Sequence, residues 1–345
     1  AHHDFVELPN GNVLFLAWDR TTRDVALAAG RDPELIEGDE FWPGAVYEVE
    51  PTRPEGGRIV WSWHAIDHVV QDTDPGLANH ADPAARPERI DINGDRDPDP
   101  PSEEEVEATR ARMRALGYAG GEDDEDDDDW RPKDADWLHM NGIDYSVELD
   151  QIALSVRFFD EVWIIDHGTT TEEAAGPAGD LLYRWGNPFA YGMGRWEERQ
   201  LFGQHNVHWI PPGHLGAGNL LVFNNGARPR EYSSVDEWWA QRDTNGRYPR
   251  KQGQPWGPAR TEWTYAHEDP DELHSPLISG AQRLPNGNTL ITESDNGRAF
   301  EITEDGTIVW DFYNPHRAGD NDEFIATLFM VERVPVEYVG WLESE

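Results

Sequence analysis

The sequence predicts an all-β protein, and more specifically a β-propeller built of four-stranded blades. A Leu-Pro-Asn-Gly-Asn turn occurs twice, at residues 8–12 and 284–288. The same series of short apolar segments accompanies each copy, and two weaker copies of the series lie between them. The chain also has 16 Trp, which supply the large apolar surface that packing between sheets requires. The repeated tryptophans are expected to lie in the core and to pack between blades, such as Trp61, Trp63, Trp185 and Trp310. Four-stranded units repeated in series are typical of propellers.

The first and last units are the clearest. Each reads as strand, Asn-Gly turn, strand, loop, strand, glycine turn and strand. We expect the Asn-Gly pair to form a type I′ turn, in which both central residues have positive φ. In the first unit the later strands are expected at 13–18, 45–49 and 58–63, and the last unit is expected to continue to about residue 312.

Two weaker units fill the middle of the chain. One is expected from His139 through 152–156 and 162–165 to 181–185. The other is expected from His205 through 209–210, 220–223 and 235–239 to 263–265. A final piece at 324–334 resembles the first strand of one more unit. We therefore expect one domain over residues 1–345. Because the chain starts inside an expected strand, we also expect that a longer precursor was cut or that only part of it is represented in this sequence.

Insertions interrupt the strand pattern. Residues 25–40 are expected to hold a short helix. Residues 91–130 form an acidic insertion with a clearer helix at about 102–116, whose first turn has the Ser-x-x-Glu spacing of a capping box. Residues 120–129 include the run Asp-Asp-Glu-Asp-Asp-Asp-Asp, which predicts a solvated loop.

The composition is strongly acidic, since 68 Asp and Glu against 28 Lys and Arg give a net charge of −40. Such a charge repels nucleic acid and anionic membranes, so we expect neither as a partner. It favours a halophilic protein, because salt would screen the repulsion. The alternative is an acidic protein from a GC-rich genome, which would also favour Arg over Lys. No apolar run approaches the roughly 20 residues that span a bilayer. The absence of Cys excludes disulfides, thiolate metal sites and Cys nucleophiles.

Polar residues gather where each unit begins. The first strand of each blade lines the central channel of a propeller, so equivalent residues of successive blades converge on one axis. We therefore expect one small space to be shared by a set of side chains: His3, His139, Asn141, Arg157, His205 and Arg283. The repeated turn is expected to place His3 and Arg283 at equivalent points of their units. Arginines and histidines at one axis of so acidic a protein indicate an anion site.

These segments resemble the arylsulfotransferase family, the aryl-sulfate sulfotransferases that need no nucleotide sulfate donor. The resemblance rests on residues 2–5 with 8–12, 139–144 with 149–157 and 162–167, 203–205 with 216–226, and 279–292. It implies a six-bladed propeller with its site in the central channel, whereas four units and a fragment are visible in this sequence. The missing blades would then belong to an absent N-terminal part, or the blade count of the family does not carry over to this chain.

The resemblance also implies roles for single residues. It implies that His205 attacks the sulfur of an aryl sulfate and becomes a sulfohistidine, from which a phenol takes the sulfuryl group. His139, Asn141 and Arg157 match the groups around the sulfate oxygens, and His3 matches a further channel histidine. The residue types agree with this chemistry, because sulfuryl transfer needs a neutral imidazole, donors for anionic oxygens and a proton for the departing phenolate.

Two further residues, Arg283 and His208, are assigned to substrate binding. His208 lies three residues beyond His205, an odd offset that would turn it to the other face of a strand. His167 matches the family pattern but would equally brace a turn. The other histidines outside the unit starts are expected to be structural: His64, His68, His80, His214, His267, His274 and His316. Converging histidines would also suit zinc or copper, but Arg157 at the same place argues against a cation.

A second candidate site lies in the acidic insertion. Oxygen-bearing side chains alternate before the expected helix, at Asp91, Asn93, Asp95, Asp97 and Asp99. The spacing resembles a calcium loop of the EF-hand type. It departs from that pattern because Arg96 stands where Gly is expected and Ser102 stands where the bidentate Glu is expected. A structural calcium ion and a plain acidic surface loop both explain the pattern.

Two functions from different classes follow from these observations. The first is a secreted enzyme, extracellular or periplasmic, that moves a sulfuryl group from an aryl sulfate to a phenol without a catalytic cofactor. The alternative is a non-catalytic extracellular propeller, stabilised by calcium, that binds a ligand or builds a surface layer or filament. A homo-oligomer or an extracellular assembly is compatible with either. The enzyme requires an open pocket where His3, His139, Arg157 and His205 meet.

Overall fold

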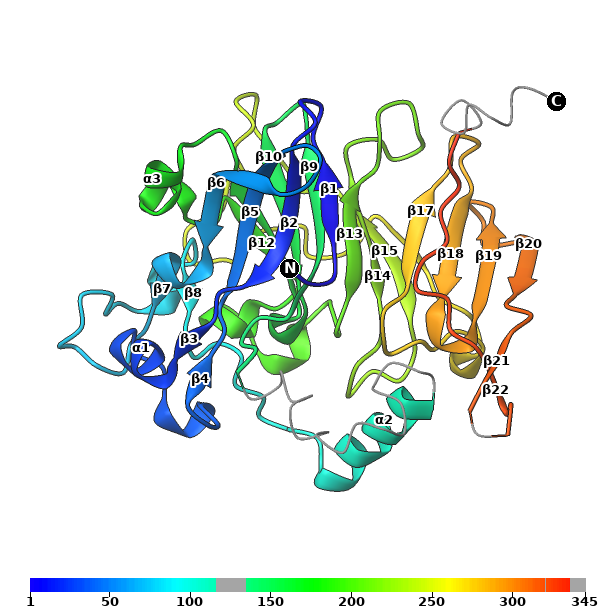
Figure 1. Ribbon diagram of the computed structural model, residues 1–345, viewed down its shortest axis with the longest axis horizontal. Coiled ribbons are helices and arrows are strands. Elements are labelled where there is room, and N and C mark those ends of the chain that lie inside the picture. The colour runs from blue at the N-terminus through cyan, green and yellow to red at the C-terminus, as the bar shows by residue number, and fades with distance from the viewer. Residues whose placement is uncertain (116–134, 320, 336–345) are drawn as a thin grey trace.

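The computed structural model describes residues 1–115, 135–319 and 321–335, and it is mostly β. It contains four four-stranded antiparallel sheets, one for each expected unit, and the strands of each sheet follow one another in chain order (Figure 1). The strands of the first unit are β1 (Phe5–Glu7), β2 (Val13–Trp18), β5 (Gly44–Pro51) and β6 (Gly57–His64). Those of the second are β9 (Met140–Ser146), β10 (Gln151–Val156), β11 (Glu161–Asp166) and β12 (Tyr183–Trp185). Those of the third are β13 (His205–Trp209), β14 (Leu220–Asn224), β15 (Ser234–Trp238) and β16 (Trp263–Tyr265). Those of the fourth are β17 (Gly280–Arg283), β18 (Thr289–Glu293), β19 (Arg298–Ile302) and β20 (Ile308–Tyr313).

Short elements occupy the connections. The pairs β3 (Thr21–Thr22) with β4 (Glu40–Phe41), β7 (Val69–Val70) with β8 (Ile90–Asp91), and β21 (Arg317–Ala318) with β22 (Phe324–Ile325) form two-stranded sheets. The helices are α1 (Arg23–Ala28), α2 (Glu103–Ala115) and α3 (Thr171–Ala174). Short 3-10 turns lie at Pro33–Leu35, Ala65–His68, Pro83–Ala85, Arg157–Phe159, Pro177–Gly179, Pro188–Tyr191, Trp196–Glu198, Pro270–Glu272 and Ser294–Asn296.

The predicted helices are confirmed. Helix α2 begins after Ser102, whose Oγ accepts the N–H of Glu105 at 3.3 Å, while the Glu105 carboxylate accepts the N–H of Ser102 at 2.8 Å. These reciprocal bonds are the expected capping box. In the first insertion, α1 and the turn Pro33–Leu35 provide the expected helical structure. The acidic run at 120–129 lies outside the described residues.

The repeated turn closes a hairpin, but its type differs from the expected one. Gly11 and Gly287 have φ of 82° and 88°, whereas the asparagine before each does not have positive φ. The N–H of Gly11 donates to the carbonyl of Leu8, and the N–H of Leu8 donates to the carbonyl of Asn12. This is a type I turn followed by a left-handed glycine. The proline explains the difference, because it fixes φ near −65° at the first central position, where type I′ requires positive φ.

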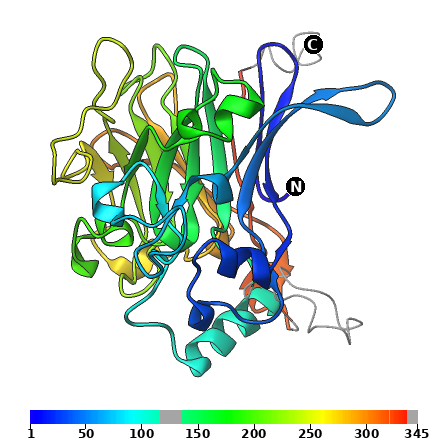
Figure 2. The same cartoon turned by 90° about the vertical axis from the view of Figure 1, so that its left-hand side faces the viewer.

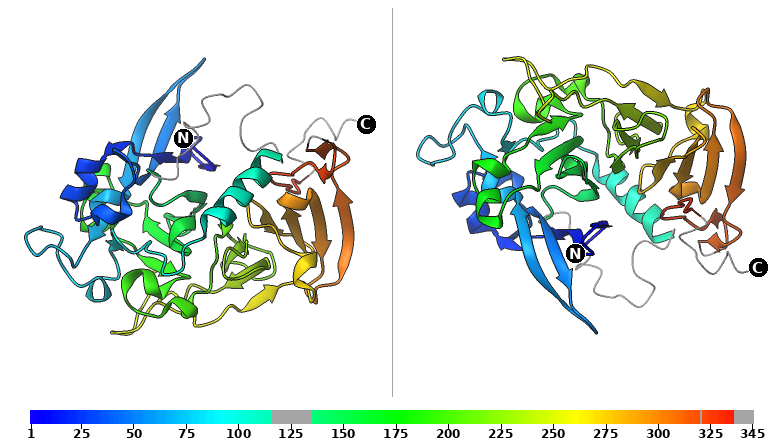
Figure 3. Two further views of the ribbon diagram at one scale, coloured as in Figure 1. Left: turned by 90° about the horizontal axis from the view of Figure 1, so that it is seen from below. Right: turned by 90° about the horizontal axis from the view of Figure 1, so that it is seen from above.

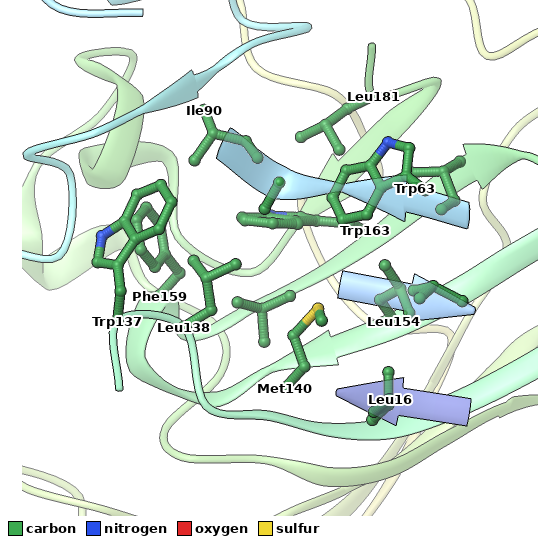
Figure 4. Close-up of a cluster of buried hydrophobic side chains, with 14 of the residues drawn as sticks. Leu16, Trp63, Ile90, Trp137, Leu138, Met140, Leu154, Phe159, Trp163 and Leu181 are labelled. Carbon is green, nitrogen blue, oxygen red and sulfur yellow. The ribbon is translucent and has the colours of Figure 1, made fainter. Parts of the chain in front are cut away.

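The core lies between the sheets, in three clusters of buried apolar side chains. Strand β10 shows why both faces of a sheet are buried. Ile152 and Leu154 pack in the first cluster and Ala153 packs in the second, because successive side chains of a strand point to opposite faces. Figure 4 shows the first cluster, in which Trp63 of β6 lies near Trp163 of β11. Each sheet is therefore packed face to face against the next.

The tryptophans expected in the core are buried with one exception. Trp61, Trp63 and Trp185 are buried, but Trp310 on β20 is 39% exposed. Strand β20 is the outer strand of the fourth unit, and its side chains are exposed along its whole length. The prediction for Trp310 was wrong, because its face of the sheet has no neighbouring sheet among the described residues.

The sheets stand side by side around a common centre, as the views along their ends show (Figure 3). Contacts join β1 to β9, β9 to β13, and β13 to β17, so the first strands line the inside of the arrangement. Seen from the side, the long β5–β6 hairpin projects beyond the other strands (Figure 2). The described residues establish four such sheets and not a closed ring of blades. The expected strand at 324–334 is also shorter, because only β22 is regular and it pairs with β21.

Candidate functional site

The first strands of the four units begin with an unusual backbone. His3 precedes β1, His139 precedes β9 and His205 opens β13. The φ angles of His3, His139, Asn206 and Ser279 are 57°, 46°, 57° and 76°. Positive φ is uncommon outside glycine, and residues held in this region tend to cluster at functional sites. A residue with positive φ therefore recurs at the start of each first strand.

His3 and His139 form an edge-to-face pair with ring centroids 4.6 Å apart. Nδ1 of His139 lies 2.7 Å from a carboxylate oxygen of Asp136, and its ring stacks on Phe158. Because an ionised carboxylate only accepts, Nδ1 of His139 carries a proton and Nε2 is left to give or take one. On its other side, His3 contacts His2, with 2.7 Å between their Nδ1 atoms.

His205 is held in one tautomer. Its Nδ1 lies 2.7 Å from Oδ1 of Asn225, and Nδ2 of Asn225 donates to the carbonyls of Ser275 and Ile278 at 2.7 and 2.6 Å. Since both N–H bonds of Asn225 are engaged, its oxygen accepts the Nδ1 proton, and Nε2 of His205 keeps its lone pair. Burial and then the charge of Arg157 lower the pKa of His205 to about 3. The imidazole is therefore neutral in neutral solution.

Arg157 is a cation without a bonded anion. It opens the turn Arg157–Phe159 after β10 and is only partly exposed. Among the described residues its guanidinium makes no hydrogen bond or ion pair. The nearby carboxylate of Asp160 is occupied, because it binds Arg199 at 2.5 Å and the N–H of Gly203 at 2.6 Å. Desolvation lowers the pKa of Arg157, yet a guanidinium stays charged. An unpaired guanidinium beside a neutral imidazole suits an oxyanion.

A hollow lies between these side chains. Its polar lining includes His3, Asn141 and His205, and its apolar lining is Ile278, Phe329 and Met330. One N–H of Asn141 donates to a backbone carbonyl at 2.9 Å, and its Oδ1 is buried without a partner among the described residues. The structure thus brings His3, His139, Asn141, Arg157 and His205 into one region. Of these, only His3, Asn141 and His205 line the hollow, and its volume of about 20 Å³ has room for about one water molecule.

Arg283 lies apart from this group. Its guanidinium is buried 2.6 Å from Glu237 and stands over the ring of Trp263. The expected equivalence with His3 was wrong, because His3 lies five residues before the first repeated turn and Arg283 lies one residue before the second. Ser279 is the counterpart of His3 by that measure. Arg283 therefore joins the third and fourth units at the opposite end of β17.

His208 shares the face of His205, contrary to the offset argument. His205 pairs with Phe223 and His208 pairs with Leu221, so three steps on β13 span two steps on β14. This β-bulge takes up the extra residue and restores the alternation. Nδ1 of His208 lies 3.2 Å from the carbonyl of Asn206, and His208 does not line the hollow.

The acidic loop before α2 is a packing loop held by arginine. Asp95 binds the guanidinium of Arg31 with both oxygens. Asn93 accepts the N–H of Asp32 at 2.8 Å. In the part of the chain that the structure describes, no three His, Asp or Glu side chains are grouped as a metal site. The loop therefore does not gather its five expected ligands, Asp91, Asn93, Asp95, Asp97 and Asp99, around one point, and calcium binding stays a prediction.

Two residues that the sequence did not single out orient the histidines. Asp136 lies three residues before His139, and this Asp-x-x-His spacing is a signal that the sequence does contain. Asn225 lies at the end of β14, and nothing in the local sequence links it to His205. Only the contact between β13 and β14 brings the two together.

The comparison with protein families agrees with this geometry. A family model described as Arylsulfotransferase (ASST) matches residues 1–310, which include the histidines, Asn141 and Arg157. The chain belongs to the arylsulfotransferase family. A search of curated proteins found no match.

The solved structures add little to this family assignment. A protein of unknown function from Bacteroides caccae matches with a TM-score of 0.31 and 12% identity, over 52% of this chain and 47% of that one. A likeness at this level carries no argument about the arylsulfotransferase chain. Separately, none of its described helices is long and apolar enough to cross a membrane.

Proposed function

We propose that this arylsulfotransferase moves a sulfuryl group from an aryl sulfate to a phenol through a sulfohistidine on His205. The observation that carries the proposal is the neutral imidazole of His205, whose Nδ1 proton is held by Asn225, beside the unpaired guanidinium of Arg157. A nucleophile, an oxyanion partner and a buried hollow are the three requirements of this chemistry.

In the first half of the reaction, the Nε2 lone pair of His205 attacks sulfur, and the bond from sulfur to the aryl oxygen breaks. The electron pair of that bond leaves with the aryl oxygen, which takes a proton from Nε2 of His139. Asp136 holds the other nitrogen of His139 and orients its ring. The guanidinium of Arg157 stabilises the negative charge that the sulfuryl oxygens carry in the transition state.

In the second half, a phenol occupies the position that the first aryl group has left. His139 takes the phenol proton, the phenol oxygen attacks sulfur, and the electron pair of the sulfur–nitrogen bond returns to His205. The apolar side chains of Ile278, Phe329 and Met330 line the hollow. An aromatic ring would pack against them once the hollow widens beyond its present room for about one water molecule. The enzyme ends as it began, which requires no further cofactor.

We also propose that the four sheets belong to a propeller whose channel contains this site. The face-to-face packing of successive sheets and the position of all first strands on the inner side support this architecture.

The proposal is tested with a chromogenic aryl sulfate and an acceptor phenol. His205→Ala is expected to lower transfer by at least about 10³-fold, because the nucleophile is removed. Mass spectrometry of the wild-type enzyme after donor alone should show the addition of one SO3 group at His205. His214→Ala is the matched control, since half-buried His214 bonds, in the described part of the chain, only to the backbone at 3.4 Å. Full activity of His205→Ala would refute the mechanism, and donor binding without turnover by the wild type would favour a ligand-binding propeller.

A further inference from the structure

Asp295 is a buried carboxylate that lacks hydrogen-bond donors. It lies in the turn Ser294–Asn296 between β18 and β19, and its side chain has no exposed area. Neither carboxylate oxygen has a hydrogen-bond partner among the described residues. Burial raises the pKa of Asp295 to about 7. A buried carboxylate without donors is costly, so a cation close to it has a strong effect on stability.

The cation at this carboxylate comes from the acidic insertion. Nε of Arg112, on α2, lies 4.0 Å from Asp295, and its guanidinium stands 5.7 Å from the ring centre of Phe324. Arg112 and Asp295 line a surface pocket next to the turn Ser294–Asn296. Arg298 lines the same pocket and is already paired with Asp311 and Glu293. The other charged residues that line the pocket are Asp271, Glu272, Arg317 and Glu323. Carboxylates outnumber arginines there, so the pocket attracts the guanidinium of α2.

Among the described residues, two ion pairs join helix α2 to the rest of the chain. No residue of the helix is buried, so apolar packing does not fix it. One anchor is Arg112 at Asp295, and the other is Arg228, which binds Glu105 at 3.3 Å and Asp99 at 3.6 Å. The view from below shows α2 crossing the ends of the sheets between the second and fourth units (Figure 3).

Both anchors are connected to the candidate site through intervening residues. Asp295 donates its N–H to Oγ of Ser275 at 3.0 Å, and the carbonyl of Ser275 accepts from Asn225, the residue that holds His205. Arg228 follows Ala227, whose Cβ would lie 3.1 Å from a methyl group on Gly203. The same methyl group would lie 3.8 Å from Nε of Arg157. The helix thus spans from the Arg157 side of the site to the His205 side.

We propose that α2 is a strap across the histidine end of the sheets, with Arg112 as its latch and Asp295 as the socket. The latched strap limits the entry of water to the hollow, and release of Arg112 opens it. This role in shielding the intermediate rests on the proposed sulfuryl transfer, whereas the latch itself does not.

Hydrogen exchange measures the latch directly. In Arg112→Gln we expect the amides of residues 103–115 to exchange about tenfold faster, since a loss of about 1.4 kcal/mol is a factor of ten. Arg110→Gln is the matched control, because in the part of the chain that the structure describes Arg110 pairs only with Glu107 of its own helix, at 3.7 Å. The double variant Arg112→Gln with Asp295→Asn no longer buries a lone carboxylate, so it should fold normally and still exchange fast. Equal protection of α2 in Arg112→Gln and Arg110→Gln would overturn the latch.

The division of the sulfuryl group between water and phenol tests whether α2 shields the hollow. With donor and phenol both present, Arg112→Gln should raise the ratio of inorganic sulfate to sulfated phenol several-fold over the Arg110→Gln control, because water reaches the intermediate more often. An unchanged ratio with faster exchange would show a latch that does not shield the site and would overturn the strap. If no variant transfers sulfate at all, the proposed function fails while the exchange result still decides the latch.

Discussion

The depressed pKa of His205 predicts how the enzyme responds to acid. With a pKa of about 3, only about 1% of the rings are protonated at pH 5. An ordinary histidine, with a pKa of about 6.5, would be about 97% protonated at pH 5, so the fraction of neutral, nucleophilic imidazole would be about 30-fold lower than at pH 8. We therefore expect protonation of His205 to lower the rate constant for release of the aryl group by no more than about twofold between pH 8 and pH 5.

A rapid-quench experiment with excess enzyme isolates this step, because a single turnover does not depend on the acceptor. Samples are made alkaline after quenching, so that the released phenolate absorbs equally at every reaction pH. An acid limb with a midpoint near pH 6.5 in the wild type would refute the assignment of His205 as the buried neutral nucleophile.

Asn225→Asp tests the cause of the shift. The new carboxylate lies against Nδ1 and favours the protonated ring, so the acid limb should move to higher pH. The change also removes two N–H donors from the carbonyls of Ser275 and Ile278, at about 1–3 kcal/mol each. A thermal melt must therefore accompany the kinetics. A folded Asn225→Asp enzyme with the flat wild-type profile would contradict the role given to Asn225.

Three further predictions follow from the same structure. Arg157→Gln should lower kcat/KM for the aryl sulfate by about 10²–10³-fold, measured by initial rates, because it removes the oxyanion partner but keeps a polar side chain. Folded His205 binds its proton at a lower pH than an unfolded histidine, so the unfolded state takes up more protons and stability falls as the pH drops below about 6.5. Between pH 7 and pH 5 this effect lowers the free energy of unfolding by about 2 kcal/mol. His205→Gln should remove this part of the pH dependence when the free energy of unfolding is measured with denaturant at each pH. The net charge of −40 predicts that raising NaCl from about 0.1 to about 2 M increases the melting temperature, and an unchanged or lower value would contradict the halophilic interpretation.

Local signals explain what the sequence predicted well. Each unit was found from turns and alternating apolar residues, which act within about ten positions of the chain. The position of His139 and His205 followed from the start of their units. Asn225 and the latch between Arg112 and Asp295 depend on contacts between distant segments, for which no alternation or spacing exists. The error at Arg283 arose from counting back to the repeated turn without the register of the strand.

The contacts of Arg283 support the prediction that the piece at 324–334 contains the first strand of one more unit. Arg283 lies 2.6 Å from Glu237 of the preceding unit. Arg333 lies 2.6 Å from Glu301 in the same way, and its N–H and carbonyl both bond to the side chain of Gln282. Residues 281–285 and 331–335 also match in sequence, with Arg at the third position and Pro at the fifth. The segment after β22 therefore occupies the place of an inner strand next to β17.

The exposed strand β20 leads to the same conclusion from the other side of the sheet. In the first unit, Trp63 is buried, and its Nε1 donates to the carbonyl of Gly179 in the second unit at 2.8 Å. In the fourth unit, Trp310 and Phe312 stack on each other and remain 39% and 40% exposed. Outer strands with this composition are covered by the next sheet wherever the structure describes one. An inner strand in position beside β17 and an uncovered aromatic face on β20 are the two sides of one more interface of the same kind, which supports the propeller proposed for this arylsulfotransferase.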